Sequence, residues 1–149
     1  METREILRDL REKKGLTQDA LAEHVFVTRQ AVSRWETGET QPNTETLKLL
    51  SREFDVSINT LLGSPRQLYC QCCGMPLNED DAVSREPDGA FNEDYCKWCY
   101  ADGKYVYRSL DALLDFIVPH MAAQFGGTPE TLRPQIAARL RELKHWKAQ

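Results

Sequence analysis

The stretch GLTQDALAEHVFVTRQAVSRWETG, residues 15–38, decides the fold of the first half of the chain. Its apolar residues recur every three or four positions, which is the period of a helix with one buried face. Thr17 and Thr28 are typical N-cap residues, because a threonine hydroxyl can accept a hydrogen bond from a free amide of the first helical turn. The stretch therefore predicts two short helices that cross at a steep angle, joined by a turn at about Val25 to Val27.

The second of these predicted helices has two different faces. Ala31, Val32 and Trp35 form its buried side. The opposite side, which begins after Thr28, carries polar residues, namely Arg29, Gln30, Ser33 and Arg34. In the major groove, arginine can donate two hydrogen bonds to guanine, and glutamine can pair in the same way with adenine. On a lone helix such a face is more often a solvated surface, so a DNA-reading role for it depends on the five-helix pattern around it.

The helical pattern continues on both sides of this stretch. Residues 1–63 contain five short segments of this kind, and Asn43 and Ser57 are the expected N-caps of the fourth and fifth. Because helices of this length are marginal alone, the five must share one core. The predicted fold class is mainly α, with a five-helix N-terminal domain, a small four-cysteine region with short β-strands, and C-terminal helices.

Residues 4–62 resemble the helix-turn-helix domains of Cro and the lambdoid phage repressors, the XRE family. The matching residues, at fixed spacing, are Gly15-Leu16-Thr17-Gln18, Leu21-Ala22, Val27-Thr28, Gln30-Ala31-Val32-Ser33, Trp35-Glu36, Gly38, Pro42 and Leu61-Leu62. The resemblance implies that double-stranded DNA is the partner and that Gln18 and Thr28 contact phosphates. It implies base-reading roles for Arg29, Gln30, Ser33 and Arg34. Related proteins bind inverted half-sites as two-fold dimers, so we expect a homodimer.

Phe26 departs from the family pattern, which usually has glycine at this point of the turn. Glycine adopts a positive φ at little cost, whereas phenylalanine would be strained there. Either the turn differs locally, or Phe26 extends the core or a partner surface.

The composition changes sharply near residue 64. All five cysteines and all five tyrosines follow this point, and Gly63-Ser64-Pro65 combines a helix end with a residue that cannot continue a helix. We therefore predict a DNA-binding domain at residues 1–63, a linker at 64–68 and a second domain at 69–149.

Two cysteine pairs in the second domain have the spacing of a zinc site. Cys70 and Cys73 form one C-x2-C pair, and Cys96 and Cys99 form the other after 22 intervening residues. Two such pairs across a loop are a strong zinc signature, and four thiolates close a tetrahedral site with no position open for substrate. We expect these four to hold one structural Zn²⁺. Cys72 is expected to be a bystander thiol, with ligand exchange against Cys70 or redox sensing as the alternatives.

Residues 69–147 resemble a family of small zinc ribbon domains. The matching segments are CQCCGMPL at 70–77, YCKWCYADGKY at 95–105 and LKHW at 143–146. The resemblance supports the same four ligands and assigns the C-terminal helices, about residues 109–147, to the same domain. Within these helices, Pro119 is expected to kink or interrupt one helix, and Pro134 to delay the regular part of the next.

Charge and composition exclude several classes of protein. The net charge of −4 argues against a nonspecific coat for nucleic acids, and residues 1–63 carry nine Lys/Arg and eleven Asp/Glu, a net charge of −2. No apolar run reaches the roughly 18 residues of a membrane helix, and the charged N-terminus differs from a signal peptide. We therefore expect a cytoplasmic protein without membrane contact. The absence of a catalytic motif such as HExxH predicts that it is not an enzyme.

Together these features predict a sequence-specific transcription regulator, a dimeric repressor that reads inverted half-sites with its third helix. Two alternatives remain open. One is an antitoxin-like protein whose second domain captures a protein partner while the first represses its own operon. The other is a regulator that senses zinc or oxidation through its cysteines, although a closed four-thiolate site is more often structural.

Overall fold

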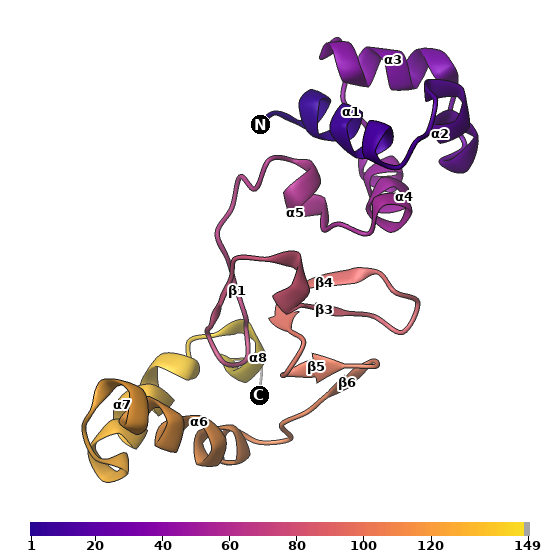
Figure 1. The fold of residues 1–149 in the computed structure, drawn as a ribbon. Coiled ribbons are helices and arrows are strands. Elements are labelled where there is room, and N and C mark those ends of the chain that lie inside the picture. Colours follow the sequence, from indigo (N-terminus) through magenta and orange to yellow (C-terminus); the bar gives the residue numbers. More distant parts are fainter. Residues whose placement is uncertain (148–149) are drawn as a thin grey trace. The chain divides into compact units, whose positions relative to one another are not determined.

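A computed structural model describes residues 1–147 and separates the chain into two compact units (Figure 1). The first unit consists of residues 1–67 together with 88–91, and the second of residues 68–87 together with those from 92 onward. Each unit has its own set of buried apolar side chains. The last two residues of the predicted second domain lie outside the described part of the chain.

The first unit is helical, as predicted. Its helices are α1 (Thr3–Lys13), α2 (Gln18–His24), α3 (Arg29–Thr37), α4 (Thr44–Phe54) and α5 (Ile58–Leu61). Thr17, Thr28, Asn43 and Ser57 cap the last four, each accepting a hydrogen bond from the backbone amide three residues further on. Because such a cap satisfies an amide that no helical bond reaches, each of these helices begins directly after its cap residue.

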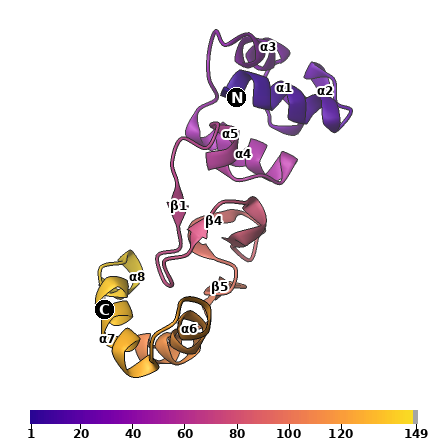
Figure 2. The ribbon, with the colours of Figure 1, turned by 60° about the vertical axis from the view of Figure 1, so that its left-hand side comes forward.

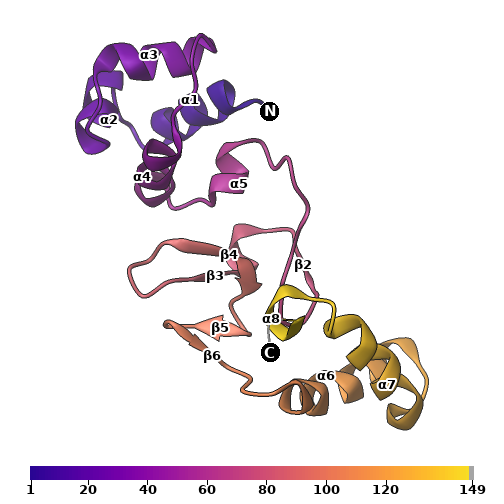
Figure 3. The ribbon, with the colours of Figure 1, turned by 180° about the vertical axis from the view of Figure 1, so that it is seen from behind.

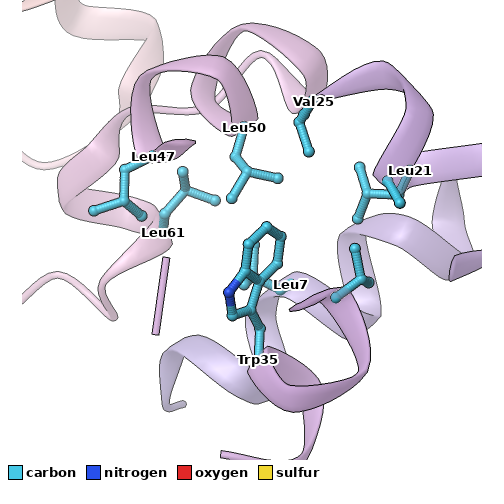
Figure 4. Packing of buried hydrophobic residues seen from close by; sticks show 9 residues of the cluster. Leu7, Leu21, Val25, Trp35, Leu47, Leu50 and Leu61 are labelled. Atoms are coloured by element: carbon cyan, nitrogen blue, oxygen red, sulfur yellow. The ribbon is translucent and has the colours of Figure 1, made fainter. Parts of the chain in front are cut away.

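One hydrophobic core holds the five helices together (Figure 4). Its buried members are Leu7, Leu21, Ala22, Val25, Val32, Trp35, Leu47, Leu50 and Leu61. Figure 4 shows these side chains pointing toward a common centre, with the Trp35 ring among the leucines. Every helix contributes at least one buried side chain, which explains how helices this short become stable.

The β region of the chain consists of very short strands. They are β1 (Leu68–Tyr69), β2 (Pro76–Leu77), β3 (Val83–Arg85), β4 (Phe91–Cys96), β5 (Tyr100–Ala101) and β6 (Lys104–Tyr105), with one turn of 3-10 helix at Asp80–Ala82. They pair as three separate two-stranded sheets, β1–β2, β3–β4 and β5–β6. In the antiparallel β1–β2 pair, Leu68 lies opposite Leu77. Isolated two-stranded sheets are marginally stable in water, so this region needs further cross-links.

The chain then returns to helix with α6 (Leu110–Phe125), α7 (Pro129–Leu140) and α8 (Lys144–Lys147). Helices α6 and α7 pack side by side as a hairpin (Figures 2 and 3). Ser109 and Thr128 are their N-caps. No helix within residues 1–147 is both long and apolar enough to cross a membrane.

The prediction for Pro134 is wrong, and the interruption predicted as one alternative at Pro119 does not occur. Helix α6 runs through Pro119 without interruption. A proline inside a helix costs about 3 kcal/mol, and the packing of α6 against α7 offsets this cost. Pro134 does not delay α7, which is regular from Pro129, because the Thr128 cap and a proline in the first turn already define its start.

Candidate functional site

Helix α2, the following turn and α3 form the candidate DNA-reading element, with the two helices packed against each other. Thr17 Oγ1 accepts a hydrogen bond from the Ala20 amide at 3.0 Å, and Thr28 Oγ1 accepts one from the Ala31 amide at 3.2 Å. Helix α3 ends at Gly38, whose φ of 83° is left-handed and carries no Cβ penalty in glycine. Local sequence signals therefore set both ends of α3.

Helix α3 presents the predicted polar face to solvent. Its buried side consists of Val32 and Trp35. The exposed residues on the other side are Thr28, Arg29, Gln30 and Arg34, and Ser33 is half-buried beside them. The five predicted residues of α3 and its cap thus lie on one accessible surface of one helix. A helix placed in a major groove would meet base edges with such a surface.

Gln18, the remaining predicted DNA-contacting residue, is half-buried in the first turn of α2. Its Nε2 donates a hydrogen bond to Glu36 Oε2 at 2.9 Å. The Glu36 carboxylate also accepts from Arg11 Nε at 2.5 Å and from Nη2 at 3.1 Å. Arg11 Nη1 in turn donates to the Leu16 carbonyl at 2.8 Å. This network joins α1, the start of α2 and α3, and so holds α3 against the rest of the unit.

The Arg11–Glu36 pair is nearly removed from solvent, with side-chain exposures of 12% and 6%. Burial would raise the pKa of Glu36, but hydrogen bonds from Arg11 and Gln18 outweigh it and hold that pKa below its ordinary value of 4.5. The sequence analysis did not identify this pair. A signal was present, because Arg11 follows Leu7 by one helical turn and so lies toward the buried side of α1.

The first unit has more acidic than basic residues, but some of its acidic side chains form internal ion pairs. Glu53 Oε1 lies 2.9 Å from Lys14 Nζ and 2.6 Å from His24 Nδ1, so this carboxylate is already engaged. Beside the polar face of α3, Glu39 Oε2 lies 3.9 Å from Arg34 Nε, and both side chains are exposed. Exposed pairs of this kind contribute about 0–1 kcal/mol, so separating Arg34 from Glu39 costs little free energy.

Phe26 lies in the turn between α2 and α3 with φ of 60° and is 83% exposed. The turn therefore keeps the left-handed geometry for which the family uses glycine, and Phe26 adds nothing to the core. The structure thus contradicts a different turn geometry and a core role for Phe26, and a role on a partner surface stays a prediction.

Cys70, Cys73, Cys96 and Cys99 converge in the second unit, where their Sγ atoms all lie within 4.8 Å of one another. The Sγ atoms of Cys73 and Cys96, one from each pair, are 3.9 Å apart. Zinc–sulfur bonds of about 2.3 Å in tetrahedral geometry separate the sulfurs by about 3.8 Å. The spacing of the cluster therefore fits a single zinc ion.

Backbone amides support the first cysteine pair as a metal-binding knuckle. Cys70 Sγ accepts hydrogen bonds from the amides of Cys72 at 3.4 Å and Cys73 at 3.5 Å, which favour a thiolate. Hydrogen bonding by the Cys73 thiol and the other cluster thiols lowers the pKa of Cys70 far below its ordinary value, whereas hydrogen bonding with Cys70 raises the pKa of Cys99. Four thiolates this close repel one another, so a bound cation is needed to ionise them all.

Cys72 is fully buried and lies outside the four-sulfur cluster. Its carbonyl accepts a hydrogen bond from Trp146 Nε1 at 2.7 Å, and the Gln71 carbonyl accepts one from the His145 amide at 3.2 Å. Helix α8 is thus anchored on the first cysteine pair. Because buried structural thiols are inert, Cys72 fits the bystander role better than redox sensing.

Aromatic rings fill the space between the knuckles and α8. The ring centroid of Tyr95 lies 5.6 Å from that of Tyr100, 5.2 Å from that of Tyr105 and 5.7 Å from that of His145. Burial lowers the pKa of His145, which keeps this ring neutral among its apolar neighbours. These residues therefore form a small core, as expected for so small a domain.

Comparison with known proteins agrees with both halves of the chain. Residues 7–61 match the family described as "Helix-turn-helix", and residues 69–147 match the family described as "Putative zinc ribbon domain". The HTH-type transcriptional activator BcrR of Enterococcus faecalis is 50% identical over 62 residues, which are 42% of this chain and 30% of the activator. The matched segment thus spans less than a third of that relative.

Two further proteins are similar to this chain. The uncharacterized HTH-type transcriptional regulator YqaE of Bacillus subtilis (strain 168) is 29% identical over 92 residues, which are 60% of this chain and 79% of that protein. A crystal structure of the P22 c2 repressor protein in complex with synthetic operator 9T has 39% identity and a TM-score of 0.41, and covers 42% of this chain and 94% of that one.

These matches are to regulator and zinc ribbon families, in agreement with the expectation that the chain is not an enzyme. The match to the zinc ribbon model extends over more than half of the chain. This protein is therefore a member of that zinc ribbon family, and residues 7–61 near its N-terminus match a helix-turn-helix domain.

Proposed function

We propose that this protein is a sequence-specific DNA-binding regulator of transcription that acts as a homodimer on inverted half-sites. The observation that carries the proposal is the exposed polar face of α3, on a helix that Val32 and Trp35 anchor in the core. One helix reads few base pairs, so two copies on a two-fold site are needed for specificity. The proposed base-reading residues are Arg29, Gln30, Ser33 and Arg34.

Gln18 and Thr28 are the proposed phosphate contacts. The amide nitrogen of Gln18 carries two hydrogens, and the bond to Glu36 uses one of them. The other hydrogen remains for a phosphate oxygen. Thr28 lies at the N-terminus of α3, where the helix dipole and the first-turn amides favour an anion. These contacts would orient the reading helix without distinguishing sequences.

The proposed role of the cysteine cluster is structural. One Zn²⁺ would be held by Cys70, Cys73, Cys96 and Cys99, and it would cross-link segments that otherwise form only two-stranded sheets. The four ligands leave no position for substrate, and the bound metal supplies folding free energy to this unit. We infer a cytoplasmic location and repression as the direction of control, which a reporter gene behind the bound site would measure.

The test is a selection of genomic fragments by the purified, zinc-loaded protein, read by sequencing. An Arg29→Ala/Arg34→Ala double variant serves as the control, because both side chains are exposed and their loss leaves the core intact. The proposal expects one inverted-repeat site that the double variant no longer enriches. No enriched site from folded, metal-replete protein would contradict it and would favour a protein-partner module instead.

A further inference from the structure

We propose that two copies of this chain pair along α6, through the exposed residues Ala112, Phe116, Pro119 and Ala123, called here the α6 seam. The inference deepens the proposed function, because a two-fold DNA site requires two copies and the seam identifies where they meet. The binding partner of this face of α6 is therefore a second copy of this chain rather than another protein.

Helix α6 is apolar on two opposite sides. Leu113, Leu114 and Val118 are buried within the second unit. The α6 seam lies on the other side, where Phe116 is 52% exposed. Surface helices normally have one apolar and one polar face, and a helix that is apolar all round is normally buried all round. Helices α6 and α7 pack side by side (Figure 2), and this packing buries one side of α6. On the other side the centroid of the Phe116 ring lies 6.0 Å from that of Tyr107 and 4.7 Å from that of His120, and about half of Phe116 stays exposed.

The spacing of the α6 seam suits a helix–helix contact. Its four residues follow one another at intervals of four, three and four positions, which is the spacing of a coiled-coil seam. The bulky ring of Phe116 alternates with small alanines at both ends, so two copies can approach closely. None of the four residues is charged, so pairing buries no charge.

The residues that flank the α6 seam are complementary between two copies. Asp115 borders one side; its side chain is 71% exposed, and its Oδ1 is 2.8 Å from Arg133 Nη1. His120 borders the other side, and its Nδ1 is hydrogen-bonded to the Phe116 carbonyl at 2.9 Å, which leaves Nε2 for another partner. In a parallel two-fold pair, opposite flanks of the two helices meet. Asp115 of each copy then faces His120 of the other, whereas an antiparallel pair sets like flanks together.

The α6 seam is short, so the dimer it forms is weak in free solution. Stable interfaces bury about 800 Å² per partner, and four residues on one helix supply less than this. On DNA, two copies held on neighbouring half-sites meet at a high effective concentration, and a weak contact then suffices. The association must therefore be measured up to near-millimolar protein.

The test is sedimentation velocity of the full, zinc-loaded chain over a range from micromolar to near-millimolar, without DNA. We expect a concentration-dependent dimer, and Phe116→Glu should weaken it at least tenfold. The matched control is Phe125→Glu. Phe125 is 73% exposed on the same helix, and its position nine residues after Phe116 puts it two and a half turns away, on the opposite side. This control should dimerise like the wild type.

Ala123→Cys tests the parallel orientation. A short bis-maleimide should link two copies of this variant, because the same position of each copy meets in a parallel pair. Linking of an Ala112→Cys and Ala123→Cys mixture, but of neither variant alone, would overturn the parallel arrangement. A wild type that stays monomeric, or equal effects of the Phe116 and Phe125 substitutions in variants with normal circular dichroism and zinc content, would overturn the seam itself.

The outcome is independent of the proposed function, since no DNA is present in these measurements. A dimer that selects no DNA site would refute the regulator reading and leave the α6 seam standing. A protein that stays monomeric in solution but selects a DNA site would refute the α6 seam and leave the regulator proposal standing.

Discussion

Replacing Phe26 with glycine is expected to stabilise the first unit, although glycine usually weakens a fold. Phe26 has φ of 60°, and a residue other than glycine pays about 1–2 kcal/mol in this left-handed region. Its ring is 83% exposed, so little packing is lost with it. Comparing Phe26→Gly with Phe26→Ala isolates the cost of the left-handed backbone conformation, because both variants lack the ring and only alanine keeps the Cβ atom. We expect the glycine variant to be more stable by about 1 kcal/mol, because its freedom in the unfolded chain offsets part of the gain.

The assay is hydrogen exchange of the full chain, followed by mass spectrometry. A peptide that contains Leu50, a fully buried core residue of the first unit, reports the stability of this unit alone. A difference of about 1 kcal/mol makes the protected amides of the glycine variant exchange about fivefold more slowly than those of the alanine variant.

Lys48 provides the matched control for this experiment. It lies inside α4 with its side chain 58% exposed, in a right-handed helical conformation. There the order must reverse, with Lys48→Gly less stable than Lys48→Ala by about 1 kcal/mol. If the Lys48 pair differs as expected while the two Phe26 variants exchange at the same rate, the turn is not strained and the reasoning is refuted.

Three further predictions concern the ion pair, the zinc ligands and the reading helix. Because the pKa of Glu36 is lowered in the folded state, its pair with Arg11 stabilises the unit above the ordinary value of 4.5 and loses this contribution as pH falls through the lowered value. Glu36→Gln should therefore reduce the free energy of unfolding by about 1–3 kcal/mol at neutral pH. It should also make this free energy fall less steeply as the pH is lowered, which urea unfolding at several pH values measures. An unchanged dependence on acid pH would contradict this prediction. Cys73→Ser should lose bound zinc and release Trp146 from its contact with Cys72, whereas Cys72→Ser should keep one zinc per chain. Inductively coupled plasma mass spectrometry measures the zinc content, and tryptophan fluorescence follows the contact of Trp146. Equal zinc loss in both variants would count against the predicted ligand set. Arg34→Ala should weaken DNA binding about tenfold to a hundredfold at one or two base pairs, measured by fluorescence anisotropy on variant sites; a uniform loss over all sequences would assign Arg34 to phosphate instead.

Most of the local structure could be predicted from sequence. Thr17, Thr28, Asn43 and Ser57 cap the helices that follow them because a side-chain oxygen satisfies an amide three residues away. The two C-x2-C pairs predicted the four-sulfur cluster in the same way, since two residues between cysteines let both reach one point. The comparisons agree with both resemblances, since residues 7–61 match a helix-turn-helix family and residues 69–147 match a zinc ribbon family. The base-reading and zinc-ligating roles remain predictions.

The tertiary structure decided what depends on residues far apart in the chain. Arg11, Gln18 and Glu36 come from three helices, and the position of Arg11 on the buried side of α1 does not identify its partners on the other two. The contact of Trp146 with Cys72 joins residues 74 positions apart, and it assigns α8 to the first knuckle. Local propensity favours a break at Pro119, but α6 continues through this residue and packs against α7. Caps, turns and metal knuckles depend on interactions over a few residues and can therefore be predicted from the sequence. Buried ion pairs and exposed apolar faces form only when the helices and strands pack together.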